Sequence, residues 1–182
     1  MFGKTMDELK TLFPNDLVEH NPRWSEWYEE EKQSIMAMLG DKLVSIDHYG
    51  STSIPGLAAK PIIDILLQVA TTADVTLLKS SLSGSGWLIM SEHLKTGLHL
   101  MLCKGYTSEG YGERVFHLHV RHPGDWNELY FRDYLIAHPD IAEEYADLKR
   151  TLVAQHRYDR NAYAQGKQEF VRLYTAKGRE DK

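Results

Sequence analysis

The sequence predicts a mixed α+β domain over residues 1–182, and three observations predict it. An amphipathic helical pattern precedes residue 40, short β-type runs occupy the middle of the chain, and helical periodicity returns in the last third. The 182 residues, 42% hydrophobic and 26% charged, are typical of one globular domain with its own core. No repeat, low-complexity tract or linker divides them. We therefore expect a mixed β-sheet with flanking helices and a helical C-terminal third.

The N-terminal half begins with a predicted helix from about Ser25 to Leu39, where apolar and aromatic residues recur at helical spacing. Ser25 is the expected N-cap, and Gly40 the expected stop. Alternation of apolar and polar residues then predicts a strand at Leu43–Tyr49. A second strand is predicted at Pro61–Val69, which is apolar on both faces, as expected of a central, buried strand.

The following segments predict a helix at Asp74–Leu82 and strands near Trp87–Met90, Leu98–Cys103 and Val115–Val120. In the last third, apolar residues again recur every three or four positions, which predicts several helices. Pro139 is expected to open one of them, because proline fits the first helical turn.

Charge and cysteine content exclude several classes of protein. The chain has 21 Lys and Arg against 26 Asp and Glu, a net charge of −5, which argues against broad binding to duplex nucleic acid or to anionic membranes. Cys103 is the only cysteine, so no internal disulfide can form, and the cytoplasm is the expected compartment. No apolar run approaches the roughly 18 to 20 residues that a membrane helix needs.

The loop Gly50–Lys60 is a candidate phosphate site, with the sequence GSTSIPGLAAK. Small residues such as Gly50, Ser51 and Thr52 let backbone N–H groups and hydroxyls approach a phosphate closely, and Lys60 would add a positive charge. The loop lacks the GK[ST] ending of a Walker A motif. An ordinary connection between two strands is the alternative interpretation.

Asp64 and two histidines form a candidate metal site. Asp64 interrupts the apolar strand, where a carboxylate is costly unless cations or donors meet it. His117 and His119 in VFHLHV lie on one face if that segment is extended. Imidazole ligands favour zinc, manganese or iron over magnesium. Histidines hydrogen-bonded at a sheet edge are the alternative interpretation.

Arg132 is a further candidate, because its guanidinium can clamp a phosphate with two donors. The alternative for Arg132 and Asp133 is an ion pair on a helix surface, which contributes little. Asp47 and His48, just before the glycine of the loop, are candidates for the same site.

Three segments, DHYGSTSIPGLAAKPIIDILL, FHLHV and LYFRDYLIAHPDIAEEYADLKRTL, resemble the GrpB family of bacterial proteins. The resemblance covers most of the chain and implies a nucleotidyltransferase-like fold, similar to the domain appended to some bacterial dephospho-CoA kinases. In that superfamily a Gly-Ser turn contacts phosphate and carboxylates hold two magnesium ions. Gly50, Ser51 and Asp64 match this pattern, whereas Leu66 stands in place of the second carboxylate.

The residues and the resemblance together suggest a protein that binds a nucleotide or another phosphorylated small molecule with a divalent metal, Mg²⁺ or Mn²⁺, with Zn²⁺ as the alternative. Nucleotidyl transfer is the candidate reaction. We expect Asp64 to be catalytic and to hold the metal with His117 and His119. The expected phosphate contacts are Gly50, Ser51, Thr52, Lys60 and Arg132. A binding or chaperone-like interaction module and a metal-dependent phosphoesterase are the alternatives, and no oligomeric state is predicted.

Overall fold

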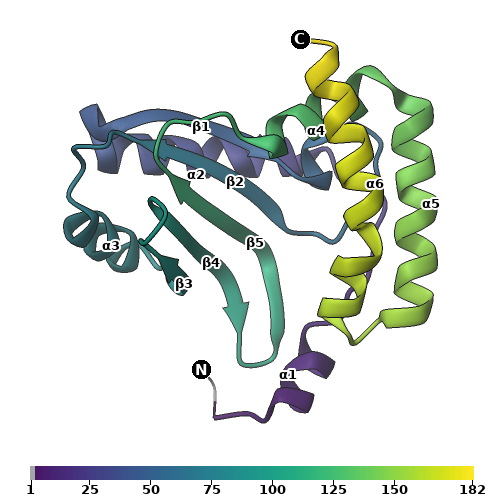
Figure 1. The fold of residues 1–182 in the computed structure, drawn as a ribbon. Coiled ribbons are helices and arrows are strands. Elements are labelled where there is room, and N and C mark those ends of the chain that lie inside the picture. The colour runs from purple at the N-terminus through teal and green to yellow at the C-terminus, as the bar shows by residue number, and fades with distance from the viewer. Residues whose placement is uncertain (1–2) are drawn as a thin grey trace.

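The computed structural model describes residues 3–182 and confirms the predicted α+β fold. A five-stranded sheet has the order β1-β2-β5-β4-β3; β2 and β5 are parallel, and the other neighbours are antiparallel. Three helices at the C-terminal end of the chain stand beside one end of this sheet (Figure 1). The elements are α1 (Met6–Leu12), α2 (Arg23–Leu39), β1 (Leu43–Tyr49), β2 (Ile63–Val69), α3 (Val75–Gly84), β3 (Leu88–His93), β4 (His99–Thr107), β5 (Gly110–Arg121), α4 (Asn127–Ala137), α5 (Pro139–His156) and α6 (Arg160–Glu180).

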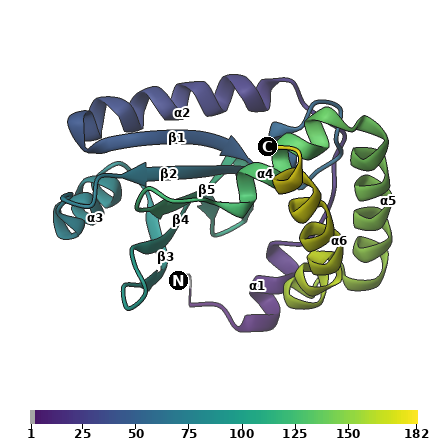
Figure 2. The same cartoon turned by 45° about the horizontal axis from the view of Figure 1, so that its top comes forward.

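The two faces of the sheet differ in character. One face packs on α2 and α3, where Ile65 and Leu67 of β2 join Trp24 and Leu82 in the main hydrophobic core. Figure 2 shows α2 lying along β1 and β2, with α5 and α6 at the far end of the sheet. Because side chains alternate along a strand, Asp64 projects from the opposite face. That polar face, next to the C-terminal helices, contains the candidate site.

The first helix and strand largely follow the prediction. The strand Leu43–Tyr49 has the predicted bounds, and Gly40 ends α2 with a positive φ of 53°. The expectation that Ser25 caps the helix is wrong, since α2 already begins at Arg23. The Ser25 hydroxyl lies inside the first turn and donates to the carbonyl of Pro22 at 2.9 Å.

The later strands are mostly longer than predicted, because β4 and β5 continue as a hairpin up to the pair Thr107 and Gly110. β2 instead begins at Ile63, two residues after the predicted start at Pro61. Proline has no N–H to offer a sheet, and Ile62 bonds locally to the Lys60 carbonyl at 2.7 Å. Apart from Asp64, all of β2 is buried, and β2 lies inside the sheet, so the prediction of a central strand is confirmed.

Helix α1 is not among the predicted elements, although the sequence at its start contains a helix-capping signal. Thr5 and Glu8 form a capping box: the Glu8 N–H donates to Thr5 Oγ1 at 3.3 Å, and the Thr5 N–H donates to Glu8 Oε2 at 2.7 Å. A threonine followed three residues later by a glutamate is a typical start of a helix.

A second hydrophobic cluster fixes the loop between β1 and β2. Ile54 and Leu57 of this loop pack against Leu135 of α4 and against Ala142 and Tyr145 of α5. The helical third therefore holds the loop in place as well as flanking the sheet. None of the helices in residues 3–182 is long and apolar enough to cross a membrane.

Candidate metal and phosphate site

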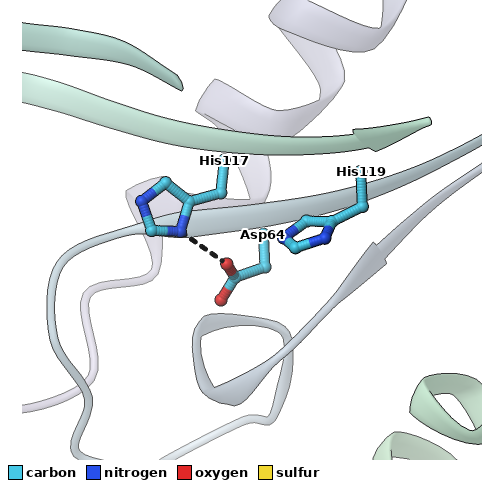
Figure 3. A group of neighbouring side chains, drawn as sticks. All are labelled: Asp64, His117 and His119. Carbon is cyan, nitrogen blue, oxygen red and sulfur yellow. Dashed lines mark hydrogen bonds and ion pairs between the residues drawn. The ribbon is translucent and has the colours of Figure 1, made fainter. Parts of the chain in front are cut away.

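Asp64, His117 and His119 come together on the polar face of the sheet (Figure 3). The parallel register of β2 and β5 pairs Asp64 with His117 and Leu66 with His119. One ligand atom from each of the three side chains lies within 4.8 Å of the other two, and Asp64 Oδ1 is 3.2 Å from His117 Nδ1. The structure thus brings together the predicted trio, and metal binding by it stays a prediction.

The composition of the trio fits one metal ion of the transition series better than a pair of magnesium ions. Leu66, two residues beyond Asp64 on the same strand, is 1% exposed and has no oxygen to offer a metal. One carboxylate and two imidazoles are ligands typical of Zn²⁺, Mn²⁺ or Fe²⁺. Burial lowers the pKa of His119 to about 4, so at neutral pH its imidazole is in the unprotonated form that binds metals.

Asp64 is held as a carboxylate. Burial acts to raise its pKa, but the hydrogen bond from His117 and the neighbouring charges outweigh burial, so the pKa lies below its ordinary value. The other ring nitrogen of His117, Nε2, is 2.7 Å from the hydroxyl of Tyr106, whose ring stacks on the imidazole. A partner of this kind fixes the orientation of an imidazole that would hold a metal.

Gly50 lies directly against Asp64. Its φ of 75° and ψ of −178° belong to a region that is essentially confined to glycine. A Cβ atom at this position would lie 2.5 Å from Asp64 Oδ2. Gly50, which is predicted to contact phosphate, is therefore also required for the close approach of the loop to the carboxylate.

A pocket of about 190 Å³ opens beside Asp64 and His117. Three of its side chains are lysines from separate parts of the chain: Lys60 from the loop, Lys149 from α5 and Lys167 from α6. We call it the lysine pocket. Its lining consists of Ser51, Lys60, Ile62, Asp64, His117, Lys149, Tyr163 and Lys167.

The three lysines are poorly compensated cations. Lys149 is 2% exposed, donates to the carbonyl of Ala58 and lies 4.8 Å from the ring centre of Tyr145, and no carboxylate within residues 3–182 forms an ion pair with it. Burial, followed by the charge of Lys167, lowers the pKa of Lys149 to about 7 and that of Lys60 to about 8. Burial also lowers the pKa of Lys167. An anion in the pocket would relieve this mutual repulsion.

The predicted phosphate residues are divided between this pocket and other sites. Ser51 and Lys60 line it. Thr52 is 3% exposed and closes the loop instead, because its hydroxyl donates to the Ile62 carbonyl at 3.1 Å. Arg132 lies outside the lining and joins α4 to β1 by donating to the His48 carbonyl at 3.0 Å. Arg132 also forms ion pairs with Asp133 at 2.7 Å and with Asp47 at 3.7 Å.

Lys149, Lys167 and Tyr163 line the pocket but are not among the residues predicted for the site. The signal for the first lysine was present, since Lys149 occupies the same helical stripe as Tyr145 and Leu152. Lys167 likewise follows Tyr163 by four residues. A lysine is seldom fully buried unless it is paired, so the place of Lys149 in an apolar stripe is a signal that could have been read from the sequence.

His48 lies on the face of the sheet that packs on α2, opposite to the face with Asp64. Its ring stacks on Tyr28, with 4.8 Å between ring centres, and its Nε2 is 2.9 Å from Thr52 Oγ1. Since the Thr52 hydroxyl donates to the Ile62 carbonyl, His48 Nε2–H donates to Thr52. Burial lowers the pKa of His48 to about 4. His48 therefore supports the loop from behind and does not reach the lysine pocket.

This environment predicts a pH-dependent loss of stability. An unfolded His48 takes up a proton near pH 6.5, whereas the folded one does so only near its pKa of about 4, so stability falls as the pH drops across this interval. His48→Gln keeps a donor for Thr52 without titrating. We expect it to reduce the loss by up to about 3 kcal/mol, measured by urea unfolding between pH 4 and 7. The exposed His93→Gln is the control, and an equal slope in all three proteins would contradict the assignment.

Comparisons with known proteins identify the family. The GrpB family model, described as GrpB protein, matches residues 14–177. In a solved structure, the conserved protein GrpB from Enterococcus faecalis is 31% identical and superimposes with a TM-score of 0.80 over 91% of this chain and 98% of that one. The Glutamate-rich protein GrpB of Alkalihalophilus pseudofirmus is 34% identical over 85% of this chain and 90% of its own length.

Other relatives are longer. The UPF0157 protein YqkA of Bacillus subtilis is 38% identical over 88% of this chain, which spans only 47% of that protein. A dephospho-CoA kinase of Mycolicibacterium paratuberculosis is 27% identical over 87% of this chain and 44% of the kinase. The chain thus spans about half the length of these two relatives. With the family model covering most of its residues and the Enterococcus structure matching its fold, the chain belongs to the GrpB family.

Proposed function

We propose that this protein binds a nucleotide through its phosphates, together with one divalent metal ion. The observation that carries the proposal is that two groups of side chains meet at one pocket. One buried lysine, Lys149, and two partly buried lysines line it, and the Asp64, His117 and His119 trio stands at its edge. A bound metal would offset the negative charge of phosphate oxygens, and the lysines would hold the remaining charge. Buried cations without counterions cost stability, and a bound polyphosphate would supply the missing negative charge.

Binding, and not two-metal nucleotidyl transfer, is the function that these residues support best. Leu66 leaves one carboxylate where two magnesium ions would need several. The donor set fits a single ion, for which Mn²⁺ or Zn²⁺ is better suited than Mg²⁺. In this proposal Asp64 and the two histidines hold the metal, and Ser51 and the three lysines contact the phosphates.

The test is a thermal unfolding panel with ATP, GTP, CTP, UTP and inorganic tripolyphosphate, each with and without Mn²⁺, Mg²⁺ or Zn²⁺. A ligand at about 100 times its Kd adds roughly 2.7 kcal/mol, which shifts the midpoint by about 5 to 10 °C for a chain of this size. We expect a metal-dependent shift in the wild type. Asp64→Asn keeps the shape of the side chain but removes its charge, so the metal-dependent part of the shift should disappear.

Asp41→Asn, at an exposed turn outside the site, is the matched control and should behave as the wild type does. The midpoint of each variant without ligand reports whether its fold is intact. A metal-dependent shift that persists in Asp64→Asn would remove this carboxylate from the site. No shift with any of the five compounds would overturn the proposed function.

A further inference from the structure

A groove of about 480 Å³ runs along one face of α6, next to the lysine pocket. Its volume is in the range of small-molecule sites in proteins. We call it the α6 groove. Its lining consists of Asn127, Ala164, Lys167, Gln168, Val171, Arg172, Thr175, Ala176 and Arg179.

The α6 groove adjoins the lysine pocket, because Lys167 lines both. Lys167 is near the start of the α6 face that forms the groove, and Arg179 is at the far end of the groove. With a rise of 1.5 Å per residue, the groove extends roughly 18 Å beyond Lys167. In Figure 1, α6 stands upright beside the end of the sheet. Because Lys167 lines the lysine pocket together with Asp64, the groove extends from that pocket along the helix.

The lining of the groove is apolar with a few hydrogen-bonding groups, and it contains no carboxylate. Val171, Ala164 and Ala176 supply the apolar surface, and Gln168 supplies an amide. The amide of Asn127 adds only its N–H donors, because its Oδ1 accepts from Arg179 Nε at 2.8 Å. A side-chain amide such as that of Gln168 can donate to and accept from one heterocyclic edge, as amides do with bases in nucleic acids. This lining suits an uncharged organic group attached to an anion.

Two side chains of the groove have unused hydrogen-bonding capacity. Thr175 is 7% exposed, and its Oγ1 has no hydrogen-bond partner among the described residues. Arg172 forms no ion pair within residues 3–182, whereas Arg179 is paired with Asp125 at 2.6 Å. A buried hydroxyl without a partner is uncommon in folded proteins.

We propose that the α6 groove binds the nucleoside of the same nucleotide whose phosphates occupy the lysine pocket. This inference rests on the proposed function, since it assigns the organic half of that ligand. The shared Lys167 joins the two sites and supplies a positive charge at the end of the groove where the phosphates would lie, and the rest of the lining has no carboxylate. The ligand class is therefore a nucleoside polyphosphate, in contrast to a simple inorganic or small phosphorylated anion.

The experiment compares nucleotide with tripolyphosphate in two tryptophan variants, using calorimetry in the presence of the metal that gives the largest thermal shift. Ala176→Trp fills the groove about 14 Å along α6 from Lys167, well away from the phosphates. Leu173→Trp places the same side chain on the other side of α6, where Leu173 is 45% exposed and outside the groove. Both positions are exposed, so both variants should fold.

In the wild type, the best of ATP, GTP, CTP and UTP should bind at least about tenfold more tightly than tripolyphosphate. Ala176→Trp should reduce this nucleotide to the affinity of tripolyphosphate and leave tripolyphosphate binding unchanged, and Leu173→Trp should alter neither. Equal affinities in the wild type, or an Ala176→Trp variant that keeps the preference or weakens both ligands equally, would overturn the groove assignment alone. If neither compound binds, the phosphate site itself is wrong.

Discussion

Lys149→Met is expected to stabilise the fold and to abolish phosphate binding. Lys149 is 2% exposed, and burial lowers its pKa from near 10.5 to about 7, which corresponds to a cost of roughly 4 kcal/mol at neutral pH. Methionine fills a similar volume without a charge. Losing the hydrogen bond to the Ala58 carbonyl costs about 1 to 3 kcal/mol, so the net gain should be about 1 to 3 kcal/mol. The unfolding midpoint should rise by about 2 to 4 °C for each kcal/mol.

The pH dependence provides an independent check on the same residue. An unfolded lysine keeps its proton up to about pH 10.5, whereas folded Lys149, with a pKa of about 7, has lost it, so the wild type gains stability as the pH rises between these values. Denaturant unfolding from pH 7 to 10 should show a shallower rise in Lys149→Met. Lys60 and Lys167 change in the same direction, so part of the slope should remain in the variant.

The control is Lys177→Met, because Lys177 is exposed but also lies over a tyrosine ring, 5.0 Å from the centre of Tyr174. It should change neither the midpoint nor tripolyphosphate binding measurably. A lower midpoint in Lys149→Met would show that the buried cation is well compensated. Retained tripolyphosphate binding would remove Lys149 from the phosphate site.

Gly50→Ala is expected to destabilise the protein strongly and to remove metal binding. The backbone region that Gly50 occupies costs other residues about 1 to 3 kcal/mol. The added methyl group would also lie 2.5 Å from Asp64 Oδ2, and overpacking of this kind costs a further 1 to 3 kcal/mol or so. We expect a loss of about 2 to 5 kcal/mol by denaturant unfolding, with Asp64 pushed out of position for the metal.

Gly56→Ala separates the two contributions to this loss. Gly56 also has a positive φ, 76°, but nothing lies within 4 Å of an added Cβ, so this variant should show backbone strain alone. In an Asp64→Ala background, the cost of Gly50→Ala should decrease, because the carboxylate that it meets is gone. If the two glycine variants lose the same free energy, the contact with Asp64 is not a constraint.

Much of the fold could be predicted because its signals are local. The alternation at Leu43–Tyr49 and the apolar run of β2 predict strands from a few neighbouring residues, and the same alternation places His117 and His119 on one face. Asp64 attracts attention because a carboxylate is out of place in a buried strand. The error at Ser25 is also local, since several residues near the start of a helix can serve as its cap.

The site was harder to predict because its parts are far apart in the chain. Arg132 has the chemistry of a phosphate clamp, yet the packing of α4 turns it toward Asp47 and the His48 carbonyl. Thr52 lies next to Ser51 in the loop, but its hydroxyl donates to the Ile62 carbonyl instead of facing the pocket. Residue type therefore indicates what a side chain can do, and its surroundings determine what it does.

The sequence by itself determined the α+β class, the buried central strand, the family resemblance and the residue types of the metal trio. Only the tertiary structure decided that Asp64 meets His117, 53 positions away, because the parallel pairing of β2 and β5 depends on the order of the strands. It also brought Lys149 and Lys167 from two helices to the same pocket. Periodicity acts between near neighbours, whereas a charged pocket arises from helix and strand packing that no local pattern contains.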